Sequence, residues 1–423
     1  MVWGGKLACL ILASAVAQRP PAVGSPLVSG PALQQAGFIK FWEAQVPLVA
    51  GDTIRDAHLV DEALYVVSAL GSIFSLKADV GLLRWGAKLT EADYRIYPPA
   101  HVHEGDGAGL VVVPTTTAVF IYDRFSGALK NRFRPEFALG SAAVGIGNSL
   151  FMGGADGKFY SLRVDPRFPE RPIKRWEVLA GGPVTATPAL YDRDTLLFAS
   201  QSGKVFACLA GDKSFRWSFR TQGAIHGDPA VDGSGVYVAS TDRSLYKLHR
   251  MTGKILWRAR FPRPLSEGPV VAAQSVYQFC PDQGLTTLDA MSGRERWRME
   301  DGRSLAAHSP NGDVVFTTGN LIRVVHHEKG DLLATVEAPS VFKAVSDTQD
   351  GSVFLLGRDG RVLCTRLDDV PYLRRQQVMA ARQQLNQPPM DESKSPERLP
   401  QPFVPQPDPT EDDPLRSKKD TNP

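Results

Sequence analysis

The chain has 423 residues, of which 43% are hydrophobic and 22% are charged. This composition supports a large buried core and excludes a chain that is disordered throughout. With 48 Lys and Arg against 45 Asp and Glu, the net charge of +3 gives no reason to expect nucleic acid as a partner.

The N-terminus has the order of a secretory signal peptide. Lys6 supplies a positive charge, residues 7–16 form a ten-residue apolar core, and Ala15 and Ala17 place small residues at its end. We therefore predict a signal peptide over residues 1–17, and hence export. Cys9 begins the apolar core instead of following it, so it does not have the position of a lipid-attachment cysteine. Residues 18–37 are rich in Pro, Gly and Ser, which predicts a flexible linker.

The body of the chain is a repeat with a period of about 40 residues. Each copy has an alternating apolar strand, a polar turn with Gly and a short strand that carries Trp. The apolar strand occurs eight times, near residues 64, 109, 149, 195, 235, 275, 313 and 352. Small-residue stretches such as GPVTATPAL, GAIHGDPAV and SEGPVVAA precede several copies, as expected for innermost strands that crowd around an axis. We predict an all-β, eight-bladed β-propeller with four strands in each blade.

The two ends of the repeat complete each other. The eighth copy ends near Leu367 without a Trp strand, whereas residues 38–48 contain a Trp strand without a preceding copy. We therefore predict that the N-terminal segment supplies the outer strand of the last blade, so that the propeller spans residues 38–367. The regularly spaced tryptophans are expected to fill the seams between blades and not to bind a ligand; they are Trp42, Trp85, Trp176, Trp217, Trp257 and Trp297.

The composition changes after the repeat. Residues 368–387 have the pattern of one short helix or a linker, with Val378, Ala381 and Leu385 on one face. Residues 388–423 contain ten prolines and few large apolar residues, which predicts a disordered tail. Cys208, Cys280 and Cys364 lie in apolar strand-like runs, so we expect buried thiols, although one disulfide remains open.

The repeat resembles the quinoprotein-type (PQQ-like) propeller family. The resemblance is carried by residues 288–297 (LDAMSGRERW), 248–257 (LHRMTGKILW) and 77–85 (KADVGLLRW), and it covers almost the whole body. Within this superfamily, the length and blade count are similar to the BamB-type assembly factors of the outer membrane. The resemblance implies a periplasmic scaffold, peripheral to the membrane at most, that works as a monomer in a complex with protein partners. This chain departs from that pattern in its missing anchor cysteine and its Pro-rich tail.

The alternative function is a quinone-dependent dehydrogenase or another small-ligand-binding propeller. The resemblance would then imply a catalytic Asp, a Ca²⁺ ion and an adjacent Cys pair, but no two cysteines are adjacent here. We therefore expect no enzyme activity and no cofactor. Asp56, Asp228 and Glu267 fall near predicted inner strands, where single acidic residues more often face a water-filled channel than share a metal. His101 and His103 supply two ligands where a metal site needs three or four, so we expect no metal site.

Two sets of residues remain as candidates. Exposed loops are expected to contact partners through Arg193, Arg243, Arg263 and Leu265, since arginine is favoured at interface centres. The channel at the axis is expected to be lined by Arg55, His226, Glu267 and Lys343.

Overall fold

The computed structural model describes residues 26–89, 94–103, 109–165, 168, 172–192, 194–310, 312–346 and 351–368. The chain divides into two units, residues 1–386 and 387–423, and every element below belongs to the first unit. The predicted signal peptide, the predicted helix from residue 369 onward and the predicted tail lie outside the described residues.

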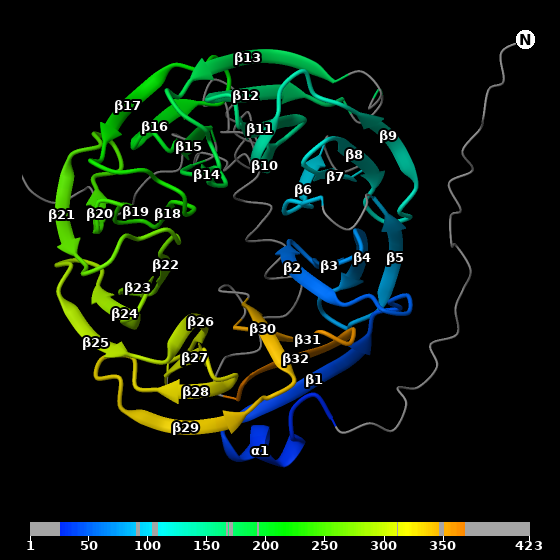
Figure 1. The fold of residues 1–423 in the computed structure, drawn as a ribbon, viewed down its shortest axis with the longest axis vertical. Helices are drawn as coiled ribbons and strands as arrows, with labels where there is room; N and C mark the ends of the chain where they lie inside the picture. The colour runs from blue at the N-terminus through cyan, green and yellow to red at the C-terminus, as the bar shows by residue number, and fades with distance from the viewer. Residues whose placement is uncertain are drawn as a thin grey trace, which may run out of the picture. The chain divides into compact units, whose positions relative to one another are not determined.

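The first unit contains eight four-stranded antiparallel sheets arranged in a ring, which are the blades of a propeller (Figure 1). Blade 1 contains β2 (Ile54–Val60), β3 (Ala63–Ser68), β4 (Ser72–Lys77) and β5 (Leu83–Lys88). Blade 2 contains β6 (Ala100–His103), β7 (Gly109–Pro114), β8 (Val119–Asp123) and β9 (Leu129–Phe133). Blade 3 contains β10 (Leu139–Ile146), β11 (Ser149–Gly154), β12 (Lys158–Arg163) and β13 (Ile173–Leu179). Blade 4 contains β14 (Ala189–Leu190), β15 (Thr195–Ala199), β16 (Lys204–Leu209) and β17 (Phe215–Arg220).

The second half of the ring repeats this plan. Blade 5 contains β18 (Ala230–Val231), β19 (Val236–Ser240), β20 (Ser244–Leu248) and β21 (Ile255–Arg260). Blade 6 contains β22 (Val270–Ala272), β23 (Ser275–Cys280), β24 (Gly284–Asp289) and β25 (Glu295–Met299). Blade 7 contains β26 (Gly302–His308), β27 (Asp313–Thr317), β28 (Leu321–Val325) and β29 (Leu332–Glu337). Blade 8 contains β30 (Val341–Ser346), β31 (Val353–Gly357), β32 (Arg361–Leu367) and β1 (Phe38–Gln45).

This topology confirms the predicted fold, blade count and ring closure. The eight predicted apolar strands are the second strands of the eight blades. β1 pairs with β32 in antiparallel register, from Phe38 opposite Leu367 to Gln45 opposite Arg361. Figure 1 shows this blue strand beside the orange end of the repeat.

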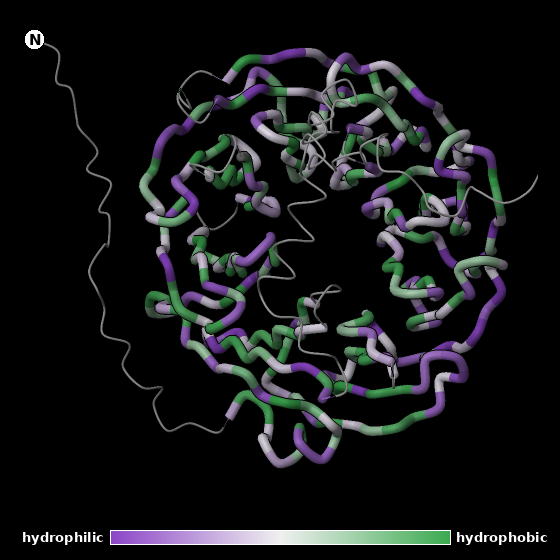
Figure 2. The backbone as a smooth tube through the Cα atoms, turned by 180° about the vertical axis from the view of Figure 1, so that it is seen from behind, coloured by the Kyte–Doolittle hydropathy of each residue, from purple (hydrophilic) through white to green (hydrophobic). Residues whose placement is uncertain are grey.

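Burial explains the two strand patterns of a blade. Second strands pack against neighbouring blades on both sides, so all six residues of β3 and all five of β15 are buried. Outer strands face solvent on one side, and β17 accordingly buries Trp217 between exposed neighbours. Figure 2 shows hydrophilic residues recurring along the outermost strands of the ring. The core consists of layers between adjacent blades; one layer, for example, joins Leu64 and Val66 of blade 1 to Phe354 of blade 8.

The inner strands of blades 4, 5 and 6 contain only two or three residues each. They follow the small-residue stretches of the sequence. A Cβ atom on Gly227 would collide with the backbone of Gly268 in the next connection. Glycine is required there because two backbones meet near the axis.

Part of the predicted flexible linker forms defined structure instead. Residues 30–35 form the helix α1 (Gly30–Gln35), which lies against β1 and β29. Leu27, Val28 and Leu33 are buried in the core layer between blades 7 and 8, against which Ala334 also packs. Composition alone missed this because three apolar residues among Pro, Gly and Ser give no periodic signal.

The antiparallel strands give the ring two distinct faces. The crossover face carries the turns between second and third strands and the connections between blades, such as residues 241–243 and 261–269. The hairpin face carries the turns between first and second strands and between third and fourth strands, such as residues 61–62 and 124–128.

Candidate functional site

The tryptophans of the outer strands join six of the eight blades to the next blade. Each indole Nε1 donates a hydrogen bond to a carbonyl oxygen in the last hairpin of the following blade: Trp42 to Ala78 (3.0 Å), Trp85 to Arg124 (3.0 Å), Trp176 to Ala210 (3.2 Å), Trp217 to Arg250 (2.7 Å), Trp257 to Ala290 (3.1 Å) and Trp297 to His327 (2.9 Å). Five of these rings also cover a glycine with positive φ in the same hairpin, as Trp217 covers Gly253. These contacts bind blade to blade and leave no indole free to stack on a ligand.

Ion pairs between neighbouring blades occupy two of the four residues predicted to line the axis. Lys343 of β30 pairs with Asp56 of β2, across the junction of blades 8 and 1. Glu267 accepts two hydrogen bonds from Arg303 of β26, at 2.7 and 2.9 Å. Arg55 and His226 are exposed. No hydrogen bond or ion pair joins any two of the four predicted residues in the described part of the chain.

Each described acidic group near the axis interacts with a partner of its own and not with the other acidic groups. Burial acts to raise the pKa of Asp56, but His58 and Lys343 outweigh it, so the net pKa is lowered. Burial lowers the pKa of His58 to about 4, against the opposing charge of Asp56. Burial raises the pKa of Asp228, although its carboxylate accepts a hydrogen bond of 2.7 Å from the Thr187 amide. These interactions favour a filled polar wall over a set of convergent ligands.

The donor set does not fit a quinone and Ca²⁺. Asp56, Asp228 and Glu267 come from the entries to blades 1, 5 and 6, and each already has its own partner. Among the residues that the structure describes, no group of three or more His, Cys, Asp or Glu side chains is placed to hold a metal ion. The three described cysteines are buried in blades 4, 6 and 8, and none of them forms the disulfide left open by the sequence.

The crossover face contains the exposed arginines among the predicted contact residues. Arg243 is exposed in the turn between β19 and β20. Arg263 lies in the connection between blades 5 and 6, and its guanidinium pairs with Asp282 of blade 6 at 2.7 Å. Arg193 lies outside the described residues, between β14 and β15.

Leu265 corrects the prediction for this loop. Its side chain is fully buried among Tyr237, Leu245 and Val276. The connection that carries it turns inward between blades 5 and 6, so an apolar side chain on this loop fills the seam instead of facing solvent. It cannot contact a partner while the blades are packed.

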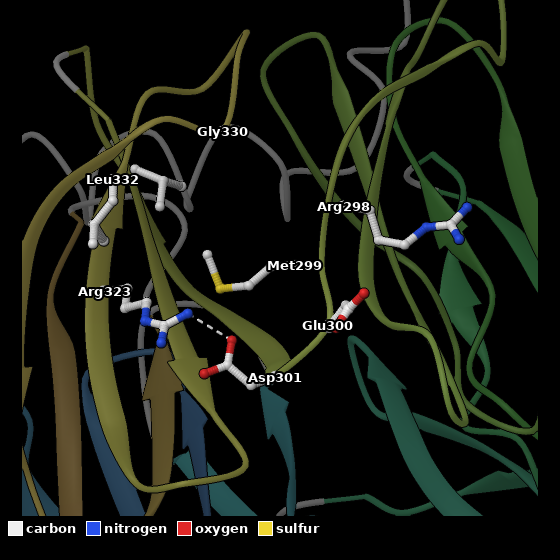
Figure 3. A pocket seen from close by; sticks show the side chains of 8 residues that line it. Arg298, Met299, Glu300, Asp301, Arg323, Gly330 and Leu332 are labelled. Carbon is white, nitrogen blue, oxygen red and sulfur yellow. Dashed lines mark hydrogen bonds and ion pairs between the residues drawn. The ribbon is translucent and has the colours of Figure 1, made fainter.

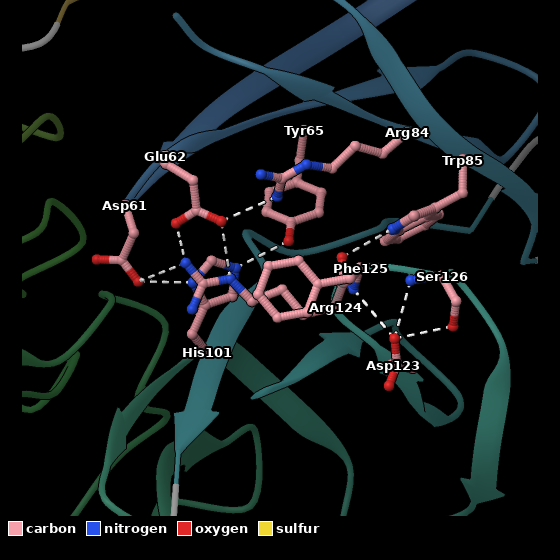
Figure 4. A network of polar contacts seen from close by, with 10 residues as sticks. All are labelled: Asp61, Glu62, Tyr65, Arg84, Trp85, His101, Asp123, Arg124, Phe125 and Ser126. Atoms are coloured by element: carbon pink, nitrogen blue, oxygen red, sulfur yellow. Dashed lines mark hydrogen bonds and ion pairs between the residues drawn. The ribbon is translucent and has the colours of Figure 1, made fainter. Parts of the chain in front are cut away.

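A buried polar cluster on the hairpin face was missed by sequence reasoning (Figure 4). Glu62, at the turn of blade 1, accepts hydrogen bonds from Arg84 at 2.9 Å and from Arg124 Nε of blade 2 at 3.1 Å. All three side chains are about 8% exposed. The exposed ring of Phe125 lies beside both guanidinium groups, at 5.5 and 5.6 Å. Since no spacing rule connects these residues, only the fold reveals the cluster.

His101 belongs to the same cluster. Its Nδ1 lies 2.6 Å from Asp61 Oδ2, and its Nε2 lies 2.8 Å from the Tyr65 hydroxyl. Burial raises the pKa of Tyr65, which keeps its hydroxyl protonated as a donor. The His101 ring lies buried between blades 1 and 2. Because both ring nitrogens have hydrogen-bond partners, neither is available to bind a metal.

The model of the family described as outer membrane protein assembly factor BamB matches residues 172–250 and 230–353. Among solved structures, BamB from Moraxella catarrhalis is similar with a TM-score of 0.62 and 14% identity, covering 79% of this chain and 99% of that chain. Over residues 172–353 the chain thus resembles the BamB-type, PQQ-like propellers, and the whole ring has the same fold as one of them. A computationally designed protein, Ika8, has the same fold with a TM-score of 0.57 and 17% identity, covering 74% of this chain and 96% of its own. A search of the curated proteins found no match.

The propeller also has a cavity of about 410 Å³ on its wall, between blades 6 and 7 (Figure 3). Met299 and Leu332 face it from two blades, and Arg323 closes one side through a 2.6 Å ion pair with Asp301. The cavity thus combines apolar side chains with charged groups that are paired within the protein. In the described ranges no helix is long and apolar enough to cross a membrane.

Proposed function

We propose that this protein is a non-catalytic scaffold of the cell envelope, exported to the periplasm, that supports the assembly of outer-membrane proteins by binding protein partners. The main support is the BamB-type, eight-bladed ring, whose acidic residues near the axis are engaged one by one instead of converging. A propeller with filled seams presents two broad loop faces, and such faces suit protein binding.

The crossover face of blades 4 to 6 is the proposed contact surface. The connections that enter these blades are nine residues each, over residues 180–188, 221–229 and 261–269. The connections that enter blades 7 and 8 contain only two and three residues. Long connections give the face relief and exposed side chains such as Arg263, and the turn between β19 and β20 on the same face adds Arg243.

Site-specific photo-crosslinking tests this function. A photoreactive amino acid is placed at exposed Gln222 or Pro262 of the crossover face and, as the matched control, at exposed Thr252 of the hairpin face. In intact cells we expect a defined cross-linked protein from the first two positions and none from the third. Cross-linking from no position would contradict the scaffold. Reduction of a redox dye by the purified protein, given quinone and Ca²⁺, would instead support the dehydrogenase alternative.

A further inference from the structure

Blade 5 is the most basic part of the ring. Residues 230–269 contain seven Lys and Arg against three Asp and Glu, whereas the whole chain has a net charge of only +3. Ion pairs within the blade do not neutralise this excess of positive charge. Arg243 and Arg260 are exposed, as is Arg220 at the end of the adjacent outer strand, and within the described ranges their guanidinium groups make no ion pair.

Backbone contacts bring these three arginines to one place on the crossover face. The Phe261 amide donates to the Arg243 carbonyl at 2.8 Å, which places Arg260 beside the turn that carries Arg243. The Gln222 amide donates to Asp242 at 3.0 Å, which ties the strand end that carries Arg220 to the same turn. We call the set Arg220, Arg243 and Arg260 the arginine patch.

The acidic groups nearest the patch do not neutralise it. The Asp242 side chain is only 6% exposed, and it already accepts hydrogen bonds from the Gln222 amide and the Tyr246 hydroxyl. Asp282 pairs with Arg263 at the surface, where both side chains are more than half exposed and such a pair is weak. An anionic partner would therefore meet guanidinium groups that are free or easily freed.

We propose that the arginine patch binds an acidic segment of a protein partner through its carboxylates. The inference rests on the proposed scaffold function and adds the chemistry of the partner. All three cations are arginines, whose planar fork matches a carboxylate with two hydrogen bonds. Large apolar side chains are not exposed over residues 218–224, 241–244 and 258–266, whereas a lipid surface would favour such side chains beside the charges.

A matched pair of triple variants tests the proposal. The patch variant is R220E/R243N/R260E, with Asn at 243 because that residue has φ of 67° and Asn tolerates the left-handed region. The control is K130E/K213N/K254E, which changes the net charge equally on exposed lysines of other hairpins and matches the φ of 62° at Lys213. Unchanged circular dichroism and thermal melting establish that both variants are folded.

The probe is a fluorescein-labelled peptide of twelve alternating Glu and Gly residues, followed by fluorescence anisotropy. We expect the patch variant to bind at least tenfold more weakly than the parent, and the lysine variant to bind within twofold of it. Equal weakening in both variants, or binding to phosphatidylglycerol vesicles without binding to the peptide, would overturn the inference. If the patch variant still forms the cross-linked complex from Pro262 at the parent level, the scaffold function stands and the acidic-segment inference fails.

Discussion

At the scale of single residues, stability depends on a few side chains that act between blades. An indole such as Trp217 combines a buried ring with one hydrogen bond to the next blade, so it supplies apolar burial and direction together. His58 makes stability depend on pH, because its burial beside Lys343 and Arg95 disfavours its charged form. Both effects can be measured by unfolding the protein.

Replacing Trp217 separates packing from hydrogen bonding. Trp217→Ala should lower the free energy of unfolding by about 3–5 kcal/mol, since it leaves a cavity in the seam. Trp217→Phe keeps an aromatic ring but leaves the Arg250 carbonyl without its hydrogen-bond donor. This should lower the free energy of unfolding by about 1–2 kcal/mol. Urea unfolding measures both, with exposed Phe215→Ala on the same strand as a control expected within about 0.5 kcal/mol. An alanine variant as stable as the parent would contradict the seam role.

His58 predicts a pH dependence with a definite sign. Its folded pKa of about 4 lies below the ordinary value of 6.5, so between these values the unfolded chain takes up a proton that the folded chain excludes. Stability is therefore complete above pH 6.5 and falls as the pH drops towards 4. Between pH 7.5 and 5 the parent should lose about 1–2 kcal/mol more than His58→Gln, measured by urea unfolding. Equal losses in both proteins would show that another group carries the effect.

At the scale of elements, the N-terminal segment has two roles. β1 completes blade 8, and residues 27–36 fill the seam between blades 7 and 8. This seam lacks an outer-strand Trp, because Ala334 stands at that position in β29. Leu27, Val28 and Leu33 enter the same core layer as Ala334, so a segment from the far end of the chain replaces one missing side chain.

This replacement can be tested within α1. Leu33 is 1% exposed, so Leu33→Ala should cost about 2–4 kcal/mol in the free energy of unfolding. Gln35→Ala, at an exposed position of the same helix, should change it by less than about 0.5 kcal/mol. Differential scanning calorimetry of both variants is the measurement. A Leu33 variant that melts with the parent would show that residues 26–37 behave as a linker after all.

The sequence predicted the strands and blades more accurately than it predicted the surroundings of the site residues. Period and Trp spacing predict eight blades and the closure by residues 38–48, because both patterns repeat in every copy. Leu265 was misplaced because the side chains around it come from both blades that its loop joins, and no local pattern encodes them. The partners of His101 are 40 and 36 residues away, at Asp61 and Tyr65, so they too are visible only in the fold. The cluster around Glu62 shows the same limit, since its partners Arg84 and Arg124 come from different hairpins.

At the scale of the whole molecule, charge is distributed unevenly around the ring. The outer strands of blades 1 to 6 contain twelve Lys and Arg against two Asp and Glu, whereas those of blades 7 and 8 contain one against two. The excess of basic residues on the outer strands thus stops at blades 7 and 8, where β1 pairs with β32.

Closure of the ring also predicts how the whole molecule responds to truncation. Deleting residues 38–48 removes β1, exposes an edge of β32 and opens the seam that holds Trp42, so we expect an aggregating, protease-sensitive protein. Deleting residues 388–423 should change the melting temperature little. Limited proteolysis and thermal melting compare the two deletions. If the first deletion melted like the intact chain, the closure strand would contribute no stability.

The closure has a further consequence for synthesis. β1 leaves the ribosome among the first strands, yet its partner β32 is complete only when Leu367 has been made. At roughly 5–20 residues per second, Phe38 and Trp42 wait on the order of half a minute without the sheet that covers them. Blade 8, and with it the closed ring, can therefore form only after almost the whole repeat has been made.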